Sequence, residues 1–489
     1  MSNLSDNNNE YQWKSRFSFL MAMIGAAVGL GNIWRFSYVL YSNGGGAFLI
    51  PYFVAIFIMG IPFLILEYGL GAKFKNSLSN ILKKIRPQLE ILGWITAFLV
   101  FLVLTYYVVI MAWDLIYLLI SFTKGWTTNP DMFFNTHIIV GANNLNNVFT
   151  PVIITLAATI FVWLLIWYIS HKALDKGISK VVNILIPLLF IMMAIIVFYS
   201  FTLPGMDIGI KALLNPNWSL LLDINIWLAA FGQIIFSLSM GQAIAVTYAG
   251  YLPENSRLVD NVLVVVAANS GFELFTSLGV FSILGFMSFT SGLPIEQIAT
   301  SGTGLLFVVF PEIFNVMGDM AYVIAPIFFL CVFFAGVTSA LAFLEPMCLA
   351  VSRKFRISRA RSVTLLCIFG FILSLVFTTA SGNYVLTIAD SFINQFGILL
   401  AVILQAVIFG WIYGVDKLIP VLNEHSTVKI GRTWVTVIKY IMPVFLSIMW
   451  IIGIFDLLNS QNSVEIIIQL LIAVIIVAVP FTLTKLKAR

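Results

Sequence analysis

The first long apolar stretch of the chain contains residues that do not suit a plain membrane helix. Residues 25–36 read GAAVGLGNIWRF, with three glycines in seven positions followed by an asparagine and an arginine. Glycine weakens helices, and polar side chains are costly in hydrocarbon. An interrupted helix frees carbonyl groups that suit Na⁺, while the N-terminus of the next half-helix suits a carboxylate. The pattern therefore predicts a site that holds an amino acid zwitterion together with sodium.

A second polar interruption lies in a later apolar stretch. Residues 236–243 read FSLSMGQA, which places two serines, a glycine and a glutamine close together. The two interrupted stretches are five predicted spans apart, and a tandem repeat of an odd number of spans must be inverted in the membrane. Paired broken segments at corresponding positions of inverted halves indicate a central binding site in a secondary transporter.

Composition places these segments in a lipid bilayer. Of the 489 residues, 61% are hydrophobic and 10% are charged, whereas soluble domains carry about a quarter charged residues. Apolar runs long enough to span a membrane recur along the whole chain, so we expect one integral domain. The predicted spans are 17–39, 46–71, 92–120, 149–170, 178–201, 222–250, 259–286, 318–350, 361–379, 385–414, 433–457 and 462–484.

The charged residues predict the orientation of these spans. Lysines and arginines are concentrated in the second, fourth and eighth loops and at the C-terminus. Under the positive-inside rule this bias places both termini in the cytoplasm. We interpret the net charge of +5 as a topology signal and not as a sign of nucleic-acid binding. We expect Glu345 and Asp114 to hydrogen-bond near span ends or to face water.

Six segments, taken together and in order, resemble the neurotransmitter:sodium symporter family and its prokaryotic amino-acid branch. They are GAAVGLGNIWRF, NGGGAFLIPY (43–52), GIPFLILEYGLG (60–71), GQIIFSLSMG (232–241), FFAGVTSALAFLEP (333–346) and WIYGVDK (411–417). The resemblance implies an all-α integral membrane fold of twelve transmembrane helices. The first ten would form two inverted five-helix repeats, residues 17–201 and 222–414, with helices 1 and 6 unwound at mid-membrane. Residues 1–16 would form a cytoplasmic tail with inner-gate residues, and 433–484 two additional helices.

The resemblance also implies a set of binding residues. One sodium would bind Ala27, Asn32, Ser237 and Asn269, and a second would bind Gly25, Val28, Ala335, Thr338 and Ser339. The substrate would contact Ala27, Leu30, Gly31, Val103, Tyr107, Phe236, Ser237, Ser239, Gln242, Ser339 and Phe343. Taken alone, the spacing of Gly25 and Gly29 more often marks a helix-packing face. Thr338 and Ser339 alone would more often be hydroxyls bonded to their own helix, and Gln242 and Phe343 are equally compatible with packing.

The resemblance assigns gates and a hinge as well. The outer gate would consist of Arg35 and Asp390 with Tyr107 and Phe236 beneath them, and the inner gate of Glu10 and Arg353 with Trp13 and Tyr251. Gly177 and Pro187 match a family hinge in the fifth span. Glu273 would replace the chloride that animal members need, which predicts chloride independence and a proton counter-flux as a further option.

These residues predict sodium-coupled symport of a neutral amino acid by alternating access in the plasma membrane. Glycine at position 29 stands where amine carriers have aspartate, so the substrate should supply its own carboxylate. An amino-acid sensor of the same fold and a passive channel stay open as alternatives, and a homodimer is a further expectation. We see no nucleophile–base pair, paired acids, organic-cofactor motif or metal cluster, and we predict that the protein is not an enzyme.

Overall fold

A computed structural model describes residues 11–140, 144–300, 302–459 and 463–486, with side chains omitted at 456–459. Within these residues the chain forms helices joined by turns, and the single β-bridge, between Pro151 and Thr379, is isolated. Ten helical stretches are long and apolar enough to cross a membrane. The all-helical membrane fold expected from composition is therefore present.

The ten uninterrupted stretches agree with the predicted spans to within a few residues at most ends. The largest difference is at the tenth predicted span (385–414), where the helical stretch continues to Glu424; smaller ones are at Pro87, Ser291 and Phe355, where 92, 286 and 350 were predicted. The stretches are Gly45–Phe74 (η1, α4, η2, α5), Pro87–Ser121 (η3, α7 Glu90–Ser121), Ile153–Ser170 (α9), Ile178–Ser200 (α10), Leu258–Ser291 (α14), Gly318–Phe355 (η7, α18 Ala321–Phe355), Arg359–Thr378 (α19 Arg359–Ser374, η8), Gly382–Glu424 (α20 Gly382–Phe392, η9, α21 Leu399–Val407, η10, η11, α22 Ile419–Glu424), Arg432–Phe455 (α23, η12, α24 Met442–Asn459) and Ser463–Lys485 (α25).

Two further spans are broken. The first consists of α2 (Arg16–Ala27) and α3 (Leu30–Ser42), which meet at a bend of 52°. The sixth consists of α12 (Ile224–Ser237) and the short α13 (Ile244–Gly250). Between α12 and α13, residues Ser239, Gly241 and Ala243 have positive φ angles of 50°, 70° and 59°. Side-chain-bearing residues rarely adopt this conformation, so the tertiary structure must hold this segment in place.

Local capping explains several other helix boundaries. The hydroxyls of Ser15, Ser77 and Ser358 accept backbone N–H groups at the starts of α2, α6 (Leu78–Ile85) and α19. At its far end α14 stops at Gly292, which has a φ of 72°. The connections between spans contain short helices. The span analysis did not predict them, because their length is far below that of a membrane crossing. They are α8 (Pro130–Phe133), α11 (Met206–Leu214), α15 (Ile295–Ile298), α16 (Gly302–Gly304) and α17 (Phe310–Val316).

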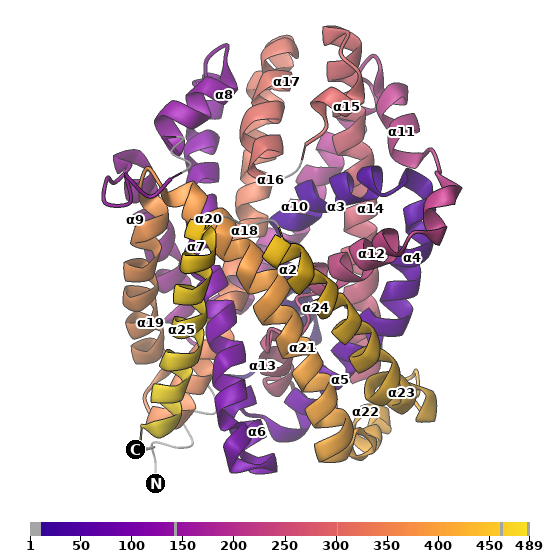
Figure 1. Ribbon diagram of the computed structural model, residues 1–489, viewed down its shortest axis with the longest axis vertical. Helices are drawn as coiled ribbons and strands as arrows, with labels where there is room; N and C mark the ends of the chain where they lie inside the picture. The colour runs from indigo at the N-terminus through magenta and orange to yellow at the C-terminus, as the bar shows by residue number, and fades with distance from the viewer. Residues whose placement is uncertain (1–10, 141–143, 301, 460–462, 487–489) are drawn as a thin grey trace.

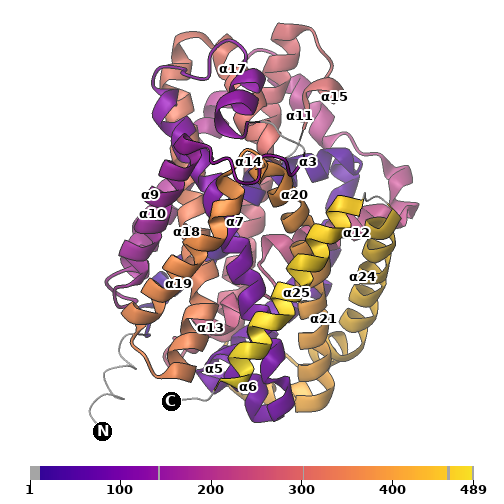
Figure 2. The same ribbon diagram turned by 60° about the vertical axis from the view of Figure 1, so that its left-hand side comes forward.

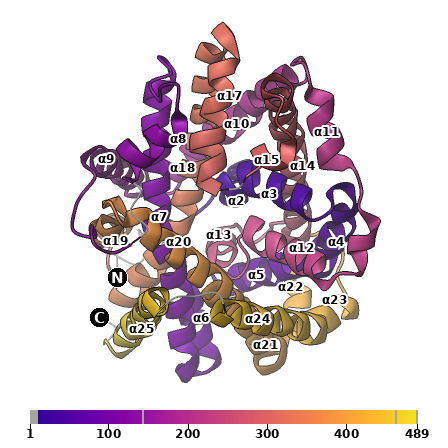
Figure 3. The same cartoon turned by 45° about the horizontal axis from the view of Figure 1, so that its top comes forward.

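The broken spans lie in the middle of the bundle. Figure 3 shows α2, α3, α12 and α13 surrounded by α7, α10, α14, α18, α20 and α21. The last two spans, α24 and α25, lie on the outside (Figure 2), and most of their residues are not covered by other helices. The described chain begins and ends at one end of the bundle, which we call the terminal end; α11, α15 and α17 lie at the opposite, far end (Figure 1).

The terminal end contains a buried ion pair that the sequence analysis did not predict. The Nζ of Lys354 on α18 lies 2.8 Å from Oε1 of Glu90 on α7, and their side chains are 4% and 5% exposed. Lys354 also donates to the carbonyl of Thr484 on α25, 3.1 Å away. The expectation that the basic residues at 353–361 are loop charges was therefore wrong for Lys354, because the helices continue further and bury it.

Substituting Lys354→Met should destabilise the folded protein by about 1–3 kcal/mol, because the Glu90 carboxylate loses a buried partner while it keeps Lys83, whose Nζ lies 2.8 Å from its Oε2. The measurement is thermal unfolding of the purified protein in detergent. Lys211→Met is the matched control: it breaks the exposed Lys211–Asp207 pair and should leave the unfolding temperature unchanged. Equal unfolding temperatures for all three proteins would contradict the assignment.

Candidate functional site

Three polar side chains from three different spans meet between the two breaks. The Nδ2 of Asn32 donates to Oδ1 of Asn269 over 2.8 Å, and Nδ2 of Asn269 donates to Oγ of Ser237 over 2.6 Å. Asn32 Nδ2 also lies 3.5 Å from Ser237 Oγ. All three residues are buried. In a low-dielectric interior this cluster holds α3, α12 and α14 together through their polar groups.

The start of α3 supplies donors on the side of this cluster that faces α7. The Gly29 N–H donates to Oδ1 of Asn32 over 2.9 Å, and the Leu30 N–H lies 3.5 Å from the hydroxyl of Tyr107. A Cβ atom at Gly29 would lie 2.9 Å from Oγ of Ser339. The helix N-terminus, the phenol and the serine hydroxyl therefore surround one point, where the macrodipole favours an anionic group.

A second group of oxygen atoms lies on the other side of the first break. The hydroxyl of Ser339 donates to the Gly25 carbonyl over 3.1 Å, and Thr338 donates to the carbonyls of Ala335 and Phe334 over 3.1 and 3.2 Å. Thr338 is thus bonded to its own helix, as the alternative interpretation expected. It nevertheless contacts the first break, because a Cβ at Gly25 would lie 2.9 Å from Cβ of Thr338.

Aromatic rings enclose the space between the breaks. The rings of Tyr107 and Phe343 meet edge to face with centroids 5.2 Å apart. A Cβ atom at Gly31 would lie 2.4 Å from the ring of Phe236, so glycine is required for this approach. Ser239 donates to the Ala26 carbonyl over 3.2 Å and joins the second break to the first.

The remaining predicted contact residues lie at the first break, on α7 and in the second break. Ala27 is the last residue of α2, and Val28 caps that helix. Val103 is buried on α7. Gln242 lies in the second break but lines a cavity of about 300 Å³ with Arg35, Phe236 and Asn394, on the side toward the far end.

Glu273 is fully buried and well supplied with donors. Tyr52 donates to its Oε2 over 2.5 Å and Gln233 to its Oε1 over 2.8 Å. Ser237 also faces this carboxyl group, which links it to the asparagine cluster. Sequence reasoning identified Glu273 but missed Tyr52 and Gln233, although both lie in the motifs that carried the resemblance.

The predicted outer ion pair is not in contact in this structure. The ion pairs between described residues do not include Arg35 with Asp390. Instead, the Arg35 guanidinium lies 4.5 Å from the centroid of the Phe236 ring. Asp390 accepts hydrogen bonds from Tyr106 over 2.8 Å and from Asn394 over 2.7 Å. Both charges therefore have other partners, which the family pattern did not indicate.

The terminal end beneath the breaks is closed by a polar and aromatic cluster. Trp13 donates through its backbone to the Tyr251 carbonyl over 3.0 Å and through its indole to the Tyr248 carbonyl over 2.9 Å. Tyr251 donates to Oε2 of Glu345 over 3.1 Å, and Arg359 donates to the same oxygen over 3.0 Å. We expected Glu345 to hydrogen-bond near a span end or to face water. Instead, its carboxylate is buried and paired with the buried guanidinium of Arg359.

Two inner-gate predictions have different outcomes. Glu10 lies outside the described residues. Arg353 lies at the terminal end with its guanidinium 6.0 Å from the centroid of the Tyr11 ring. Together with Gln12, Lys75 and Tyr251 it lines a cavity of about 340 Å³.

The proposed hinge in the fifth span is helical here. Gly177 precedes α10 as its N-cap, and Pro187 lies inside the helix. A Cβ at Gly177 would lie 2.2 Å from the Ile169 carbonyl, so close packing against the end of α9 also requires this glycine. In the preceding loop, Asp175 is paired with Lys14, and the hydrogen bond from Lys14 holds the pKa of this carboxyl below its ordinary value.

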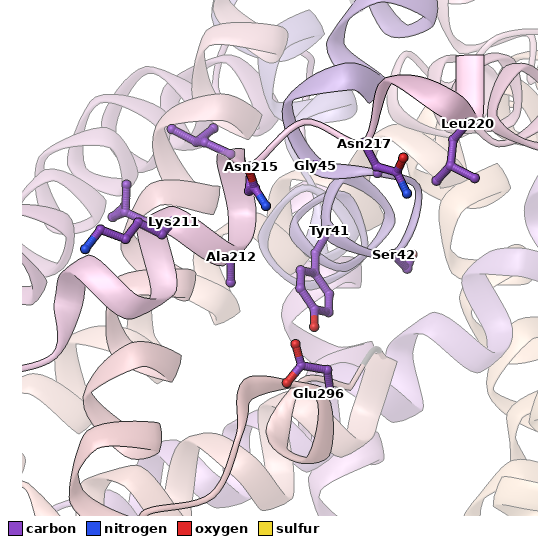
Figure 4. A pocket seen from close by; sticks show the side chains of 12 residues that line it. Tyr41, Ser42, Gly45, Lys211, Ala212, Asn215, Asn217, Leu220 and Glu296 are labelled. Atoms are coloured by element: carbon purple, nitrogen blue, oxygen red, sulfur yellow. The ribbon is translucent and has the colours of Figure 1, made fainter. Parts of the chain in front are cut away.

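A further cavity lies away from this site. It has a volume of about 1010 Å³ and opens at the far end between α3, α11 and α15. Figure 4 shows the hydroxyl of Tyr41 pointing toward Glu296, with Asn215 and Asn217 above. Half of its lining residues are exposed and only Gly45 is buried, so it lacks the enclosure of the central region.

Comparisons with known proteins cover nearly the whole chain. A model of the sodium:neurotransmitter symporter family matches residues 10–155 and 132–484. An uncharacterized sodium-dependent transporter of Methanocaldococcus jannaschii is 38% identical over 435 residues, which covers 89% of this chain and 88% of that protein. The sodium-dependent serotonin transporter of Drosophila melanogaster is 31% identical over 90% of this chain and 76% of its own length. The crystal structure of MhsT in complex with L-phenylalanine matches with a TM-score of 0.77 and 28% identity, covering 90% of this chain and 99% of that chain.

Substituting Glu345→Gln should open the terminal end, because the buried Arg359 guanidinium would lose its counter-charge. Cys348 is a native reporter, since its thiol lies 3.9 Å from the Tyr11 hydroxyl in this cluster. Its rate of maleimide labelling, followed by mass spectrometry, should rise about tenfold if the pair contributes about 1.4 kcal/mol to the closed state.

Cys331 and Cys367, which are also buried, serve as internal controls and should keep their slow labelling rates. Lys211→Met at the far end should change none of the three rates. A Cys348 rate equal to that of the unsubstituted protein would show that the Glu345–Arg359 pair does not hold this end closed.

Proposed function

The chain belongs to the sodium:neurotransmitter symporter family, and we propose that it is a sodium symporter of a neutral amino acid. The family assignment makes it a sodium-coupled transporter and not an enzyme. The observation that carries the finer proposal is the meeting of Asn32, Ser237 and Asn269 between two broken spans. This arrangement combines amide and hydroxyl oxygens with freed backbone groups, which is the donor set of a hard monovalent cation.

We assign two sodium ions to the two groups of oxygens. The first would bind the Ala27 carbonyl and the side chains of Asn32, Ser237 and Asn269, with one ligand from the substrate carboxylate. The second would bind the carbonyls of Gly25, Val28 and Ala335 and the hydroxyls of Thr338 and Ser339. The short distances from Ser339 to Gly25 and from Thr338 to Ala335 support this second set.

The substrate would lie between the breaks with its carboxylate at the start of α3. Leu30, Gly31 and the Tyr107 hydroxyl supply donors there, and Gly29 leaves room because it has no side chain. The amino group would meet the carbonyls around Ala27 and Phe236, and Ser239. The side-chain pocket, which favours an aliphatic or aromatic side chain, would be formed by Val103, Phe236, Gln242, Ser339 and Phe343. The likeness to MhsT bound to L-phenylalanine supports this substrate class.

We propose that Glu273 makes transport independent of chloride. Its carboxylate occupies the position where Tyr52, Gln233 and Ser237 converge, and a fixed negative charge at that point can balance the sodium beside it. The bovine relative named as a sodium- and chloride-dependent creatine transporter is 30% identical over 83% of this chain and 71% of its own length.

The two ends of the bundle, which would open in turn during alternating access, are packed differently in this structure. Arg35 and Asp390 stand apart above the site, whereas Trp13, Tyr251, Glu345 and Arg359 are packed beneath it. We therefore propose an outward-facing arrangement with the terminal end in the cytoplasm of a plasma-membrane protein. Glu10 and Arg353 would add to the closed inner gate, and unwinding between Gly177 and Pro187 would release the second sodium.

A passive channel and a sensor are the competing functions. A channel would give amino-acid flux without a requirement for a sodium gradient. A sensor would bind the amino acid with sodium but would not move it. Uptake against a concentration gradient in liposomes, driven by sodium, separates both from a symporter.

Purified protein in liposomes should accumulate at least one neutral amino acid from a labelled panel when sodium is higher outside. Asn32→Ala and Asn269→Ala should each abolish this uptake, because each removes an oxygen ligand and leaves buried partners unpaired. Asn423→Ala, which removes an amide side chain outside the site, is the control and should transport normally. Full sodium-coupled uptake by both site variants would refute the first sodium assignment.

Substituting Glu273→Gln should make uptake dependent on chloride, because the neutral amide no longer balances the sodium charge. The measurement is uptake in chloride compared with gluconate at constant sodium. The unsubstituted protein should show the same rate in both salts. A Gln variant that transports equally well in gluconate would show that the Glu273 charge is not needed.

A further inference from the structure

Asp114 on α7 is a buried carboxyl group that the proposed transport site does not use. The residue is 1% exposed, and neither carboxylate oxygen has a hydrogen-bond partner among the described residues. Glu67 on α5 (Ile61–Phe74) also lacks a hydrogen-bond partner among the described residues, but its carboxyl group faces the backbone of Gly241 and Ala243 in the second break. Three further acids within the bundle differ from Asp114 because each has partners. Glu273 accepts from Tyr52 and Gln233, Glu345 is paired with Arg359, and Asp390 accepts from Tyr106 and Asn394.

The position of Asp114 links it to the substrate-facing side of α7. It follows Tyr107 by seven residues, which is two helical turns or about 10 Å along the same face. Its charge acts on the Tyr107 hydroxyl and on the thiol of Cys331 on α18. The Cys331 thiol is directed to the Leu189 carbonyl of α10, 3.7 Å away, so it is engaged elsewhere.

No cation in the described residues balances an ionised Asp114. None of the ion pairs between described residues includes Asp114. Of the helices packed against α7, α9 contains no Asp, Glu, Lys or Arg, and the charged residues of α18 are Glu345, Arg353 and Lys354, toward the terminal end. Toward the far end, the carboxyl groups of Asp131 and Glu312 interact electrostatically with each other.

An unpaired carboxylate in such a place is strongly unfavourable, whereas a protonated carboxyl group costs far less. We propose that Asp114 is a proton-binding site whose occupancy is coupled to the substrate carboxylate through Tyr107. The step is simple protonation: a proton from the aqueous phase forms an O–H bond with one carboxylate oxygen. No other bond is broken, and no redox partner is required.

The sign of the coupling follows from electrostatics. An ionised Asp114 would add a negative charge on the same face of α7 as Tyr107, where the substrate carboxylate would also bind. Like charges repel strongly in a low-dielectric interior, so substrate binding favours the protonated form. By reciprocity, protonation of Asp114 favours substrate binding. The coupling rests on the proposed function, but the existence of the proton site does not.

Infrared difference spectroscopy tests the proton site without any substrate. Purified full-length protein in nanodiscs, compared between acidic and alkaline buffer, should show the carbonyl band of a buried protonated carboxyl group. Asp114→Asn should remove a component of this band, while Glu67→Gln, Asp390→Asn and Glu273→Gln should each retain that component. Should the Asp114→Asn variant fail to fold, ¹³C-labelled aspartate in the unsubstituted protein should shift the same component and leave any glutamate component in place. A band that neither Asp114→Asn nor the aspartate label changes, or no band at all in the unsubstituted protein, would overturn the proposal.

A second measurement tests the coupling. With L-phenylalanine and L-leucine as probes, sodium-driven uptake at low substrate concentration should fall severalfold from acidic to alkaline buffer. Asp114→Asn should lose most of this pH dependence while retaining uptake. A carboxyl band without uptake of any panel amino acid would uphold the proton site and reject the proposed function. Uptake with the same pH profile in both proteins would reject the coupling.

Discussion

The structure depends on one constraint: inside a bilayer, every backbone polar group must find a partner within the protein. An unbroken helix meets this constraint with its own backbone hydrogen bonds. The two broken spans, α2–α3 and α12–α13, each lose some of these hydrogen bonds at mid-span. Their partners come from the opposite break and from intact helices. Ser239 bonds to Ala26, and Ser339 bonds to Gly25. The breaks therefore complete each other and are stable only together.

The same constraint explains where charged groups lie. Buried charges are tolerated where they are paired, and Glu90 with Lys354 and Glu345 with Arg359 join helices at the terminal end. These pairs fix the end beneath the site, while Arg35 and Asp390 above it have separate partners. The proposed outward-facing arrangement rests on this difference between a tightly paired lower end and a less tightly paired upper end. Asp114 has neither an ion pair nor a hydrogen-bond partner among the described residues, and this is why we propose that it binds a proton.

Much of the fold followed from composition and hydropathy, because span length is dictated by bilayer thickness. The two interruptions could be located because glycine and short polar side chains are out of place in hydrocarbon, whereas the individual site residues were predicted from the family resemblance. Other partners were not predictable in this way. Tyr52, Gln233 and Tyr106 look like ordinary helix residues, and only the packing of distant helices shows that they reach Glu273 and Asp390.

The sequence by itself determined the membrane class, the two interruptions and the family, because these depend on local composition and on motifs contiguous along the chain. The tertiary structure alone decided which polar groups meet. It brought Asn32, Ser237 and Asn269 within hydrogen-bonding distance, although Asn32 is more than 200 residues from the other two along the chain. It also converted Lys354 and Arg359 from expected loop charges into buried partners, because helix length and packing set the depth of a side chain.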